Sequence, residues 1–507
     1  MSKISLTNFA IFASLFSVFC ITATAQSVVL TKTDLKTDAA TTRMDDETQT
    51  RVRQLETQVQ KMQEQIDALT NLINRTPKTQ IASGQIETAP DIQKAETAKI
   101  QTKPSETLPA ANPPAPQKAL GVDIGSARLT PYGTIYFNAF RNNGGTNNAD
   151  APLFATPTGN SNVGASVRQT RLGLKLEGAK VGTARLSAIL EADFFGGFPS
   201  VGIGENFGIV RLRLANARLD WEKTSITVGQ DWMVFAPANP TSLAAAAIPQ
   251  MAASGNNWAR LPQIKIERKL NDNFTWTGAI LAPQTGDFST NAAFFLQPTS
   301  GASSTVPFFQ SRIAFADTNW LGTRKGGSVG LSAHYGRSRV FTGATANIKN
   351  DIDSVGIALD WNFPLAQRLS LFGEAFFGRN LGGFQAGVFQ NYNNDFAYRN
   401  GTTLLAGGVR SIGTRGGWAQ LGFTPDVLQD RLSLYSSIGI DDPRDEDLIS
   451  RTPRDFRRQN LAFAFNLIYK FTPQFQFGGE FRLIQTLYLI TGRRTANHIN
   501  LSAAYSF

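Results

Sequence analysis

The sequence predicts an all-β fold, a transmembrane antiparallel β-barrel of about 16 strands, preceded by a short N-terminal α-helical coiled coil. Three patterns predict it: a C-terminal run with two different faces, short alternating segments whose connections are long and short in turn, and a heptad repeat near the N-terminus. The hydrophobic content of 42% and the mean hydropathy of -0.17 exclude a helical membrane protein.

The C-terminal run, residues 495–507, alternates with a period of two, as a strand between two different environments does. One face becomes apolar and ends on Tyr505 and Phe507, whereas the other is small or polar. A soluble sandwich can show the same alternation, but it rarely ends on an aromatic last residue. The run resembles the closing strand of outer-membrane β-barrels, and that resemblance implies that Tyr505 and Phe507 form the barrel assembly signal.

Residues 1–25 are predicted to be a signal peptide. Lys3 precedes an apolar run over 9–21, and the small residues at 23–25 form a cleavage site. A membrane anchor is disfavoured because the apolar run is too short. Cys20, the single cysteine of the chain, leaves with the signal, so we expect no disulfide and no thiolate metal site.

The next segments differ in composition. Residues 26–50 lack periodicity and are predicted to be disordered, and residues 51–75 carry a heptad pattern. Pro77 ends this helix, residues 76–120 form a proline-rich linker, and residues 121–507 form the barrel domain. β-branched residues at a with Leu at d favour a dimeric coil, but the e and g positions carry little charge to fix the number of helices. The predicted coil interface is Val52, Leu55, Val59, Met62, Ile66, Leu69 and Ile73.

The net charge of +10 belongs almost entirely to the barrel domain. Residues 121–507 hold 36 Lys/Arg and 27 Asp/Glu, a net charge of +9. Nucleic acid is an improbable partner for an exported chain. The basic balance therefore points to small anions or lipid phosphates.

The connections distinguish a barrel from a sandwich, because alternation alone fits both. Long connections, which suit external loops, alternate with tight turns, which suit the periplasmic side. Seventeen segments alternate in all, but a bacterial barrel needs an even number. Assigning residues 403–410 to a large external loop restores the alternation and gives about 16 strands, enough for an aqueous channel.

The chain resembles the DcaP-like trimeric outer-membrane porins, in which a coiled coil and a linker precede the barrel. Besides the heptads, the resemblance is carried by LTPYG at 129–133, VRQTRLG at 167–173, LEADF at 190–194 and VGQDW at 228–232. It implies a homotrimer in the outer membrane of a Gram-negative-type bacterium, in contact with lipids and lipopolysaccharide, with the coil in the periplasm. It also implies uptake of small, often anionic, solutes.

The third long connection, residues 232–262, is the best candidate for a pore constriction. Its alanines at 243–247 suggest a short helix. Arginine rings commonly select anions. If acidic neighbours such as Glu177, Glu267 and Glu480 neutralise them, the lumen becomes weakly selective. The predicted pore-lining residues are Arg171, Lys175, Arg185, Glu191, Asp193, Arg211, Arg213, Arg260, Lys265 and Arg482, and Arg218 falls out of phase with Arg211 and Arg213.

No pattern indicates an enzyme, a cofactor or a metal site. The acidic stretch at 441–447 lacks the spacing of a calcium loop, so a solvated external loop is favoured. The function predicted is passive diffusion of small hydrophilic solutes, with small carboxylates preferred. The alternative is a structural anchor whose coil reaches the periplasm or the cell wall.

Overall fold

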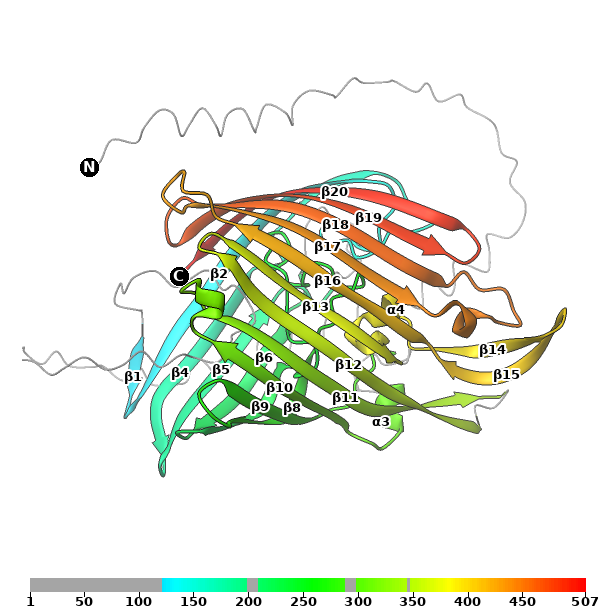
Figure 1. Ribbon diagram of the computed structural model, residues 1–507, viewed down its shortest axis with the longest axis horizontal. Helices are drawn as coiled ribbons and strands as arrows, with labels where there is room; N and C mark the ends of the chain where they lie inside the picture. The colour runs from blue at the N-terminus through cyan, green and yellow to red at the C-terminus, as the bar shows by residue number, and fades with distance from the viewer. Residues whose placement is uncertain (1–120, 198–207, 288–297, 344–346) are drawn as a thin grey trace, which may run out of the picture. The chain divides into compact units, whose positions relative to one another are not determined.

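The computed structural model describes residues 121–197, 208–287, 298–343 and 347–507. These residues form a closed antiparallel β-barrel (Figure 1). An 18-stranded sheet contains two short strands, β1 (Val122–Ile124) and β3 (Asn162–Ser166), that pair with β2 alone. The remaining 16 strands make the wall, as the sequence predicted.

The wall strands follow one another around the barrel in chain order. They are β2 (Ala127–Asn143), β4 (Arg171–Val181), β5 (Ala184–Asp193), β6 (Arg211–Asp220), β7 (Thr224–Trp232), β8 (Arg260–Lys269), β9 (Phe274–Leu281), β10 (Phe308–Asp317), β11 (Gly327–Thr342), β12 (Ile348–Ala366), β13 (Leu369–Arg379), β16 (Gly413–Phe423), β17 (Leu432–Pro443), β18 (Arg457–Lys470), β19 (Phe475–Tyr488) and β20 (Gly492–Ser506). The short helices are α3 (Ser300–Ser303), α4 (Ala386–Phe389), η1 (Trp320–Gly322), η2 (Gly382–Phe384) and η3 (Asp445–Leu448). None of the described helices is long and apolar enough to cross a membrane.

The last strand closes the barrel. β20 pairs with β19 on one side and with β2 on the other, where Thr134 is in register with Ser506. Phe507 extends this pairing through two backbone hydrogen bonds with Gly133, of 3.1 and 3.2 Å. The predicted closing role of residues 495–507 is therefore confirmed, because β20, the last wall strand, pairs with β2, the first.

The strand count depends on the hairpin of β14 (Tyr392–Asn400) and β15 (Thr403–Ser411), which forms a separate two-stranded sheet. It belongs to the sixth long connection, residues 380–412, and β13 pairs directly with β16. In Figure 1 the hairpin projects beyond the end of the wall. The prediction that 403–410 belongs to a long connection and not to the wall is thus confirmed.

The two faces of the wall differ as the alternation requires. In β20, Ile499 and Tyr505 point outward and are exposed, whereas His498 and Asn500 point inward and are buried. Inward polar side chains are buried because long connections fold into the barrel. One apolar cluster forms there around Phe235, a residue of the third long connection.

The signal peptide, the disordered segment, the coiled coil with its interface residues, and the proline-rich linker all lie outside the described residues.

Candidate functional site

The third long connection, residues 233–259 between β7 and β8, runs inside the barrel; we call it the third loop. Inward side chains of distant strands bind its backbone. The Oε1 atom of Gln310 on β10 accepts the N–H groups of Val234 and Phe235, at 2.8 and 3.0 Å. One wall residue thus satisfies two consecutive backbone donors, which a buried loop needs.

Further along, the third loop is bound by β13 and β16. The carboxylate of Glu374 accepts the N–H groups of Ala238 at 3.2 Å and Asn257 at 3.5 Å. The side-chain amide of Gln420 bonds both backbone groups of Thr241, accepting from N at 2.8 Å and donating to O at 3.0 Å. These contacts fix the middle of the loop against the wall.

The same loop also reaches β18 and β19. Glu480 accepts hydrogen bonds from Ser242 Oγ at 2.5 Å and Gln250 Nε2 at 2.8 Å. On β18, Asn460 Nδ2 donates to the carbonyl of Ala253 at 2.9 Å. Because the third loop is bonded to inward residues from β10 to β19, it crosses the interior and narrows it.

Glycines permit the closest approach between the third loop and the wall. Gly255 has φ +101°, and a Cβ at this position would lie 2.1 Å from the carbonyl oxygen of Gly417 on β16. A Cβ at Gly439 on β17 would lie 2.2 Å from the carbonyl oxygen of Ser254. The loop backbone therefore rests directly on the backbones of two wall strands.

The helix predicted at residues 243–247 does not form. Gln169 takes the backbone groups that a helix would pair internally. Its Oε1 atom accepts the N–H groups of Ala246 and Ala247, at 2.8 and 2.9 Å, and its Nε2 atom donates to the carbonyl of Ala244 at 2.8 Å. Alanine's helix propensity is a weak preference, and the hydrogen bonds with Gln169, in the connection just before β4, override it here.

Several predicted charges meet at the end of this alanine segment. Arg211 and Arg213 both bind Asp193, at 2.6 and 2.8 Å, and Arg213 also binds Glu191 at 2.6 Å. Arg211 donates in addition to the carbonyl of Ala247 at 2.9 Å. Arg213 and Asp193 are each only 1% exposed. This arginine cluster thus joins the wall to the third loop, and Arg213 acts within it as a buried partner of two carboxylates.

Arg260 completes the arginine cluster. It was predicted to lie in the third loop, but it is the first residue of β8. Its guanidinium donates to the same carbonyl of Ala247 at 3.2 Å and lies over Trp232 and Trp258, 4.5 and 5.1 Å from the ring centroids. Within the described residues it makes no ion pair with a carboxylate. Aromatic faces stabilise its charge instead.

The other predicted pore residues divide into paired and unpaired cations. Arg171 and Arg185 form no ion pair in the part of the chain that the structure describes, and Arg171 donates to the hydroxyl of Tyr136 at 3.4 Å. The remaining three are paired: Lys175 with Glu177 at 2.8 Å, Lys265 with Asp231 at 2.5 Å, and Arg482 with Glu480 at 2.6 Å. Much of the predicted basic set is therefore neutralised locally.

Arg218 was missed because β6 contains an irregularity. The register between β5 and β6 shifts at Glu191/Ala192, which changes the phase of the strand. Arg218 therefore also points inward and binds Asp220 at 2.7 Å and Glu267 at 3.3 Å. Its out-of-phase position was the one sequence signal of this bulge.

The acidic stretch at 441–447 is solvated only in its middle, at residues 444–446, whereas its first and last residues are buried. Asp441 lies in β17, is buried, and accepts the N–H groups of Gly387 and Val388 in the sixth connection, at 3.2 and 3.1 Å. Asp447 is also buried and accepts the N–H of Gly413 at 2.9 Å. These carboxylates satisfy backbone donors of neighbouring segments, which explains their burial.

No protein-family model and no curated protein matches this sequence. The structure is similar to the outer membrane channel DcaP of Acinetobacter baumannii, with a TM-score of 0.57, 16% identity, and coverage of 76% of this chain and 99% of that one. An anion-selective porin from Comamonas acidovorans (TM-score 0.46, 12% identity, 75% and 100% coverage) and Salmonella typhi OmpF (0.47, 13%, 76% and 100%) are also similar. The chain therefore shares the barrel fold of the DcaP channel.

Proposed function

We propose that this chain is an outer-membrane porin for passive diffusion of small hydrophilic solutes, with a preference for small anions such as carboxylates. The observation that carries the proposal is the third loop, which crosses a closed 16-strand barrel and meets the arginine cluster at one edge. A long inward loop in a barrel of this size is the device that leaves a narrow aqueous passage.

The solvent exposure of inward side chains supports a passage along β4 to β8. The Arg211 and Arg218 side chains are 25% and 26% exposed although they point inward. Across the barrel, the third loop covers Glu374 completely, at 0% exposed. The water that reaches the arginines therefore marks the side of the interior that the third loop leaves open.

The charge balance along this side supports anion preference. Most cations there have a carboxylate partner, but Arg171, Arg185 and Arg260 have none among the described residues. Unbalanced positive charge in a narrow passage with walls of low dielectric raises the local concentration of anions. The carboxylate partners limit the effect, so we expect a moderate preference.

The outer face of the barrel supports a homotrimer. Exposed large apolar residues on most strands include aromatic side chains, which mark the lipid interface of such barrels. On β4 to β7 they are all aliphatic: Leu172, Leu174, Val181, Leu190, Leu212 and Val228. This aliphatic sector suits contact with a second copy of the chain. In this proposal the predicted coil adds a second contact in the periplasm.

Conductance in planar bilayers tests the proposal. A porin gives stepwise ion currents when the purified full-length protein is added. The competing function is a structural outer-membrane anchor for the predicted coil. Under that alternative, correctly folded barrel inserts into the bilayer without any current.

A further inference from the structure

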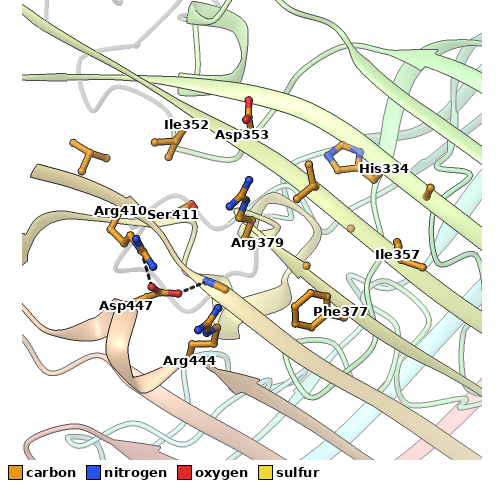
Figure 2. A pocket seen from close by; sticks show the side chains of 16 residues that line it. His334, Ile352, Asp353, Ile357, Phe377, Arg379, Arg410, Ser411, Arg444 and Asp447 are labelled. Atoms are coloured by element: carbon orange, nitrogen blue, oxygen red, sulfur yellow. Dashed lines mark hydrogen bonds and ion pairs between the residues drawn. The ribbon is translucent and has the colours of Figure 1, made fainter. Parts of the chain in front are cut away.

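A pocket lies on the outer side of the barrel wall. Its volume is about 570 Å³, and it lies between the outer face of β11 to β13 and the base of the hairpin β14–β15 (Figure 2). Residues of β15 and of the segment that follows β17, including Arg410 and Asp447, form its other side. It does not share a residue with the arginine cluster.

The floor of the pocket is apolar and faces away from the lumen. Phe377 on β13 is in register with Ile357 on β12, which is in register with Ala333 on β11. Phe377 and Ile357 are 62% and 58% exposed. Such positions on a membrane barrel contact lipid chains, so the floor continues the lipid-facing surface.

The rim of the pocket is cationic. Arg379, the last residue of β13, lies one outward position beyond Phe377 and makes no side-chain hydrogen bond or ion pair within the described residues. Arg410 and Arg444 lie across from it (Figure 2), and Arg444 forms an exposed ion pair with Glu446. Two acidic residues also line the pocket, and both have partners. Asp447 binds Arg410 at 2.8 Å and the Gly413 N–H, and Asp353 binds Arg337 at 3.0 Å.

The rim belongs to the external end of the barrel. β13 ends at Arg379, where the long sixth connection begins, and β12 begins after another connection on the same side. Phe377 therefore lies at the level of the lipid chains, and Arg379 lies at the level of the outer-leaflet headgroups. An unpaired guanidinium at that level matches phosphate in charge and in hydrogen-bond geometry.

We propose that this pocket binds a phosphate of lipopolysaccharide in the outer leaflet, with Arg379 and Arg444 at the phosphate and an acyl chain over Ile357 and Phe377. A second copy of the chain is a poorer occupant. The aliphatic sector that suits subunit contact spans β4 to β7, and in the 16-strand wall β12 lies five strands from β7 and eight from β4. The inference relies on the proposed outer-membrane location but not on conduction, so it stands even if the barrel carries no current.

Binding of purified full-length protein in detergent to bisphosphorylated lipid A tests this proposal. Arg379→Gln should weaken binding by about tenfold, because the variant loses a charge-assisted hydrogen bond to the phosphate. Arg399→Gln, on β14 of the adjoining hairpin and outside the pocket, should bind like wild type. Lipid A without phosphates should bind wild type weakly, and the Arg379→Gln variant equally weakly.

The assignment would be overturned by equal binding of dephosphorylated lipid A, by unchanged binding of Arg379→Gln, or by a disulfide crosslink between subunits through cysteines placed at Val409. Inorganic phosphate provides a further comparison. If it displaces lipid A at millimolar concentration, the acyl chain contributes nothing and the lipid assignment is wrong.

Discussion

The carboxylate of Glu374 accepts the backbone N–H of Ala238 at 3.2 Å, which joins the middle of β13 to the third loop 136 residues away in sequence. A second N–H, that of Asn257, points to the other carboxylate oxygen. Glu374 is fully buried, so water cannot replace it as an acceptor. This residue therefore fixes the loop on the side of the barrel opposite the proposed passage.

Replacing Glu374 by Ala should loosen the third loop and raise single-channel conductance with more current noise. The two N–H groups lose their acceptor, and each buried unsatisfied donor costs about 1–3 kcal/mol. Glu222→Ala, in the exposed turn between β6 and β7, is the charge-matched control and should leave the current unchanged. A quiet channel of wild-type size in the Glu374 variant would show that the loop is held elsewhere.

Gly255→Ala should destabilise the barrel in heat-modifiability gels. Its Cβ would meet the backbone of Gly417 at 2.1 Å, and overpacking of this kind typically costs about 1–3 kcal/mol. Gly286→Ala is the matched control, because Gly286 also has a positive φ, of +78°, but nothing within 4 Å of a Cβ. Equal melting temperatures for the two variants would contradict the proposed close packing.

Deleting Phe507 should lower the amount of barrel inserted in the outer membrane without affecting export. The deletion removes two backbone hydrogen bonds to Gly133 at the seam between β2 and β20, together with the predicted assembly signal. Phe471→Ser, an exposed aromatic in the turn between β18 and β19, is the control. Normal levels of folded barrel in the deletion variant would refute the assembly role.

Leu190→Arg should dissociate the oligomer, because it places a charge in the aliphatic sector proposed for subunit contact. Ile280→Arg on β9 is the control. There we expect the oligomer to persist while insertion weakens, since an arginine facing lipid costs about 2–4 kcal/mol at mid-membrane. Light scattering in mild detergent measures oligomer size.

In the predicted coil, Val59→Asp together with Ile66→Asp should likewise reduce the heat resistance of the oligomer. Unchanged oligomers in both the coil variants and the Leu190 variant would exclude these interfaces.

The wall could be predicted from sequence because its signals are local. The period of two in residues 495–507 indicates which side chains face lipid, and the lengths of the connections indicate which end of the barrel faces outward. The hairpin β14–β15 shows the limit of this reasoning. Residues 403–410 alternate like a wall strand, and only the requirement for an even strand count placed them outside.

The sequence predicted which connection enters the barrel, but it did not predict the contacts that hold this third loop in place. Gln310 and Val234 are 76 residues apart, and no local pattern shows that one will bind the other. The same holds for Gln169, whose side chain replaces the hydrogen bonds of the expected helix at 243–247. Ion pairs were more accessible to prediction, because partners such as Glu177 and Glu191 lie on the same or adjacent strands.

The reversal potential across a KCl gradient in planar bilayers tests the central claim most directly. We predict anion preference for wild type. The preference should be strongest in dilute salt, because at 0.1 M salt screening limits the field of each charge to about 10 Å. Changing Arg171, Arg185 and Arg260 together to Gln should move the potential toward zero, whereas Arg324→Gln, in the exposed turn between β10 and β11, should not. Cation preference in wild type, or the same anion preference in the triple variant, would contradict the account.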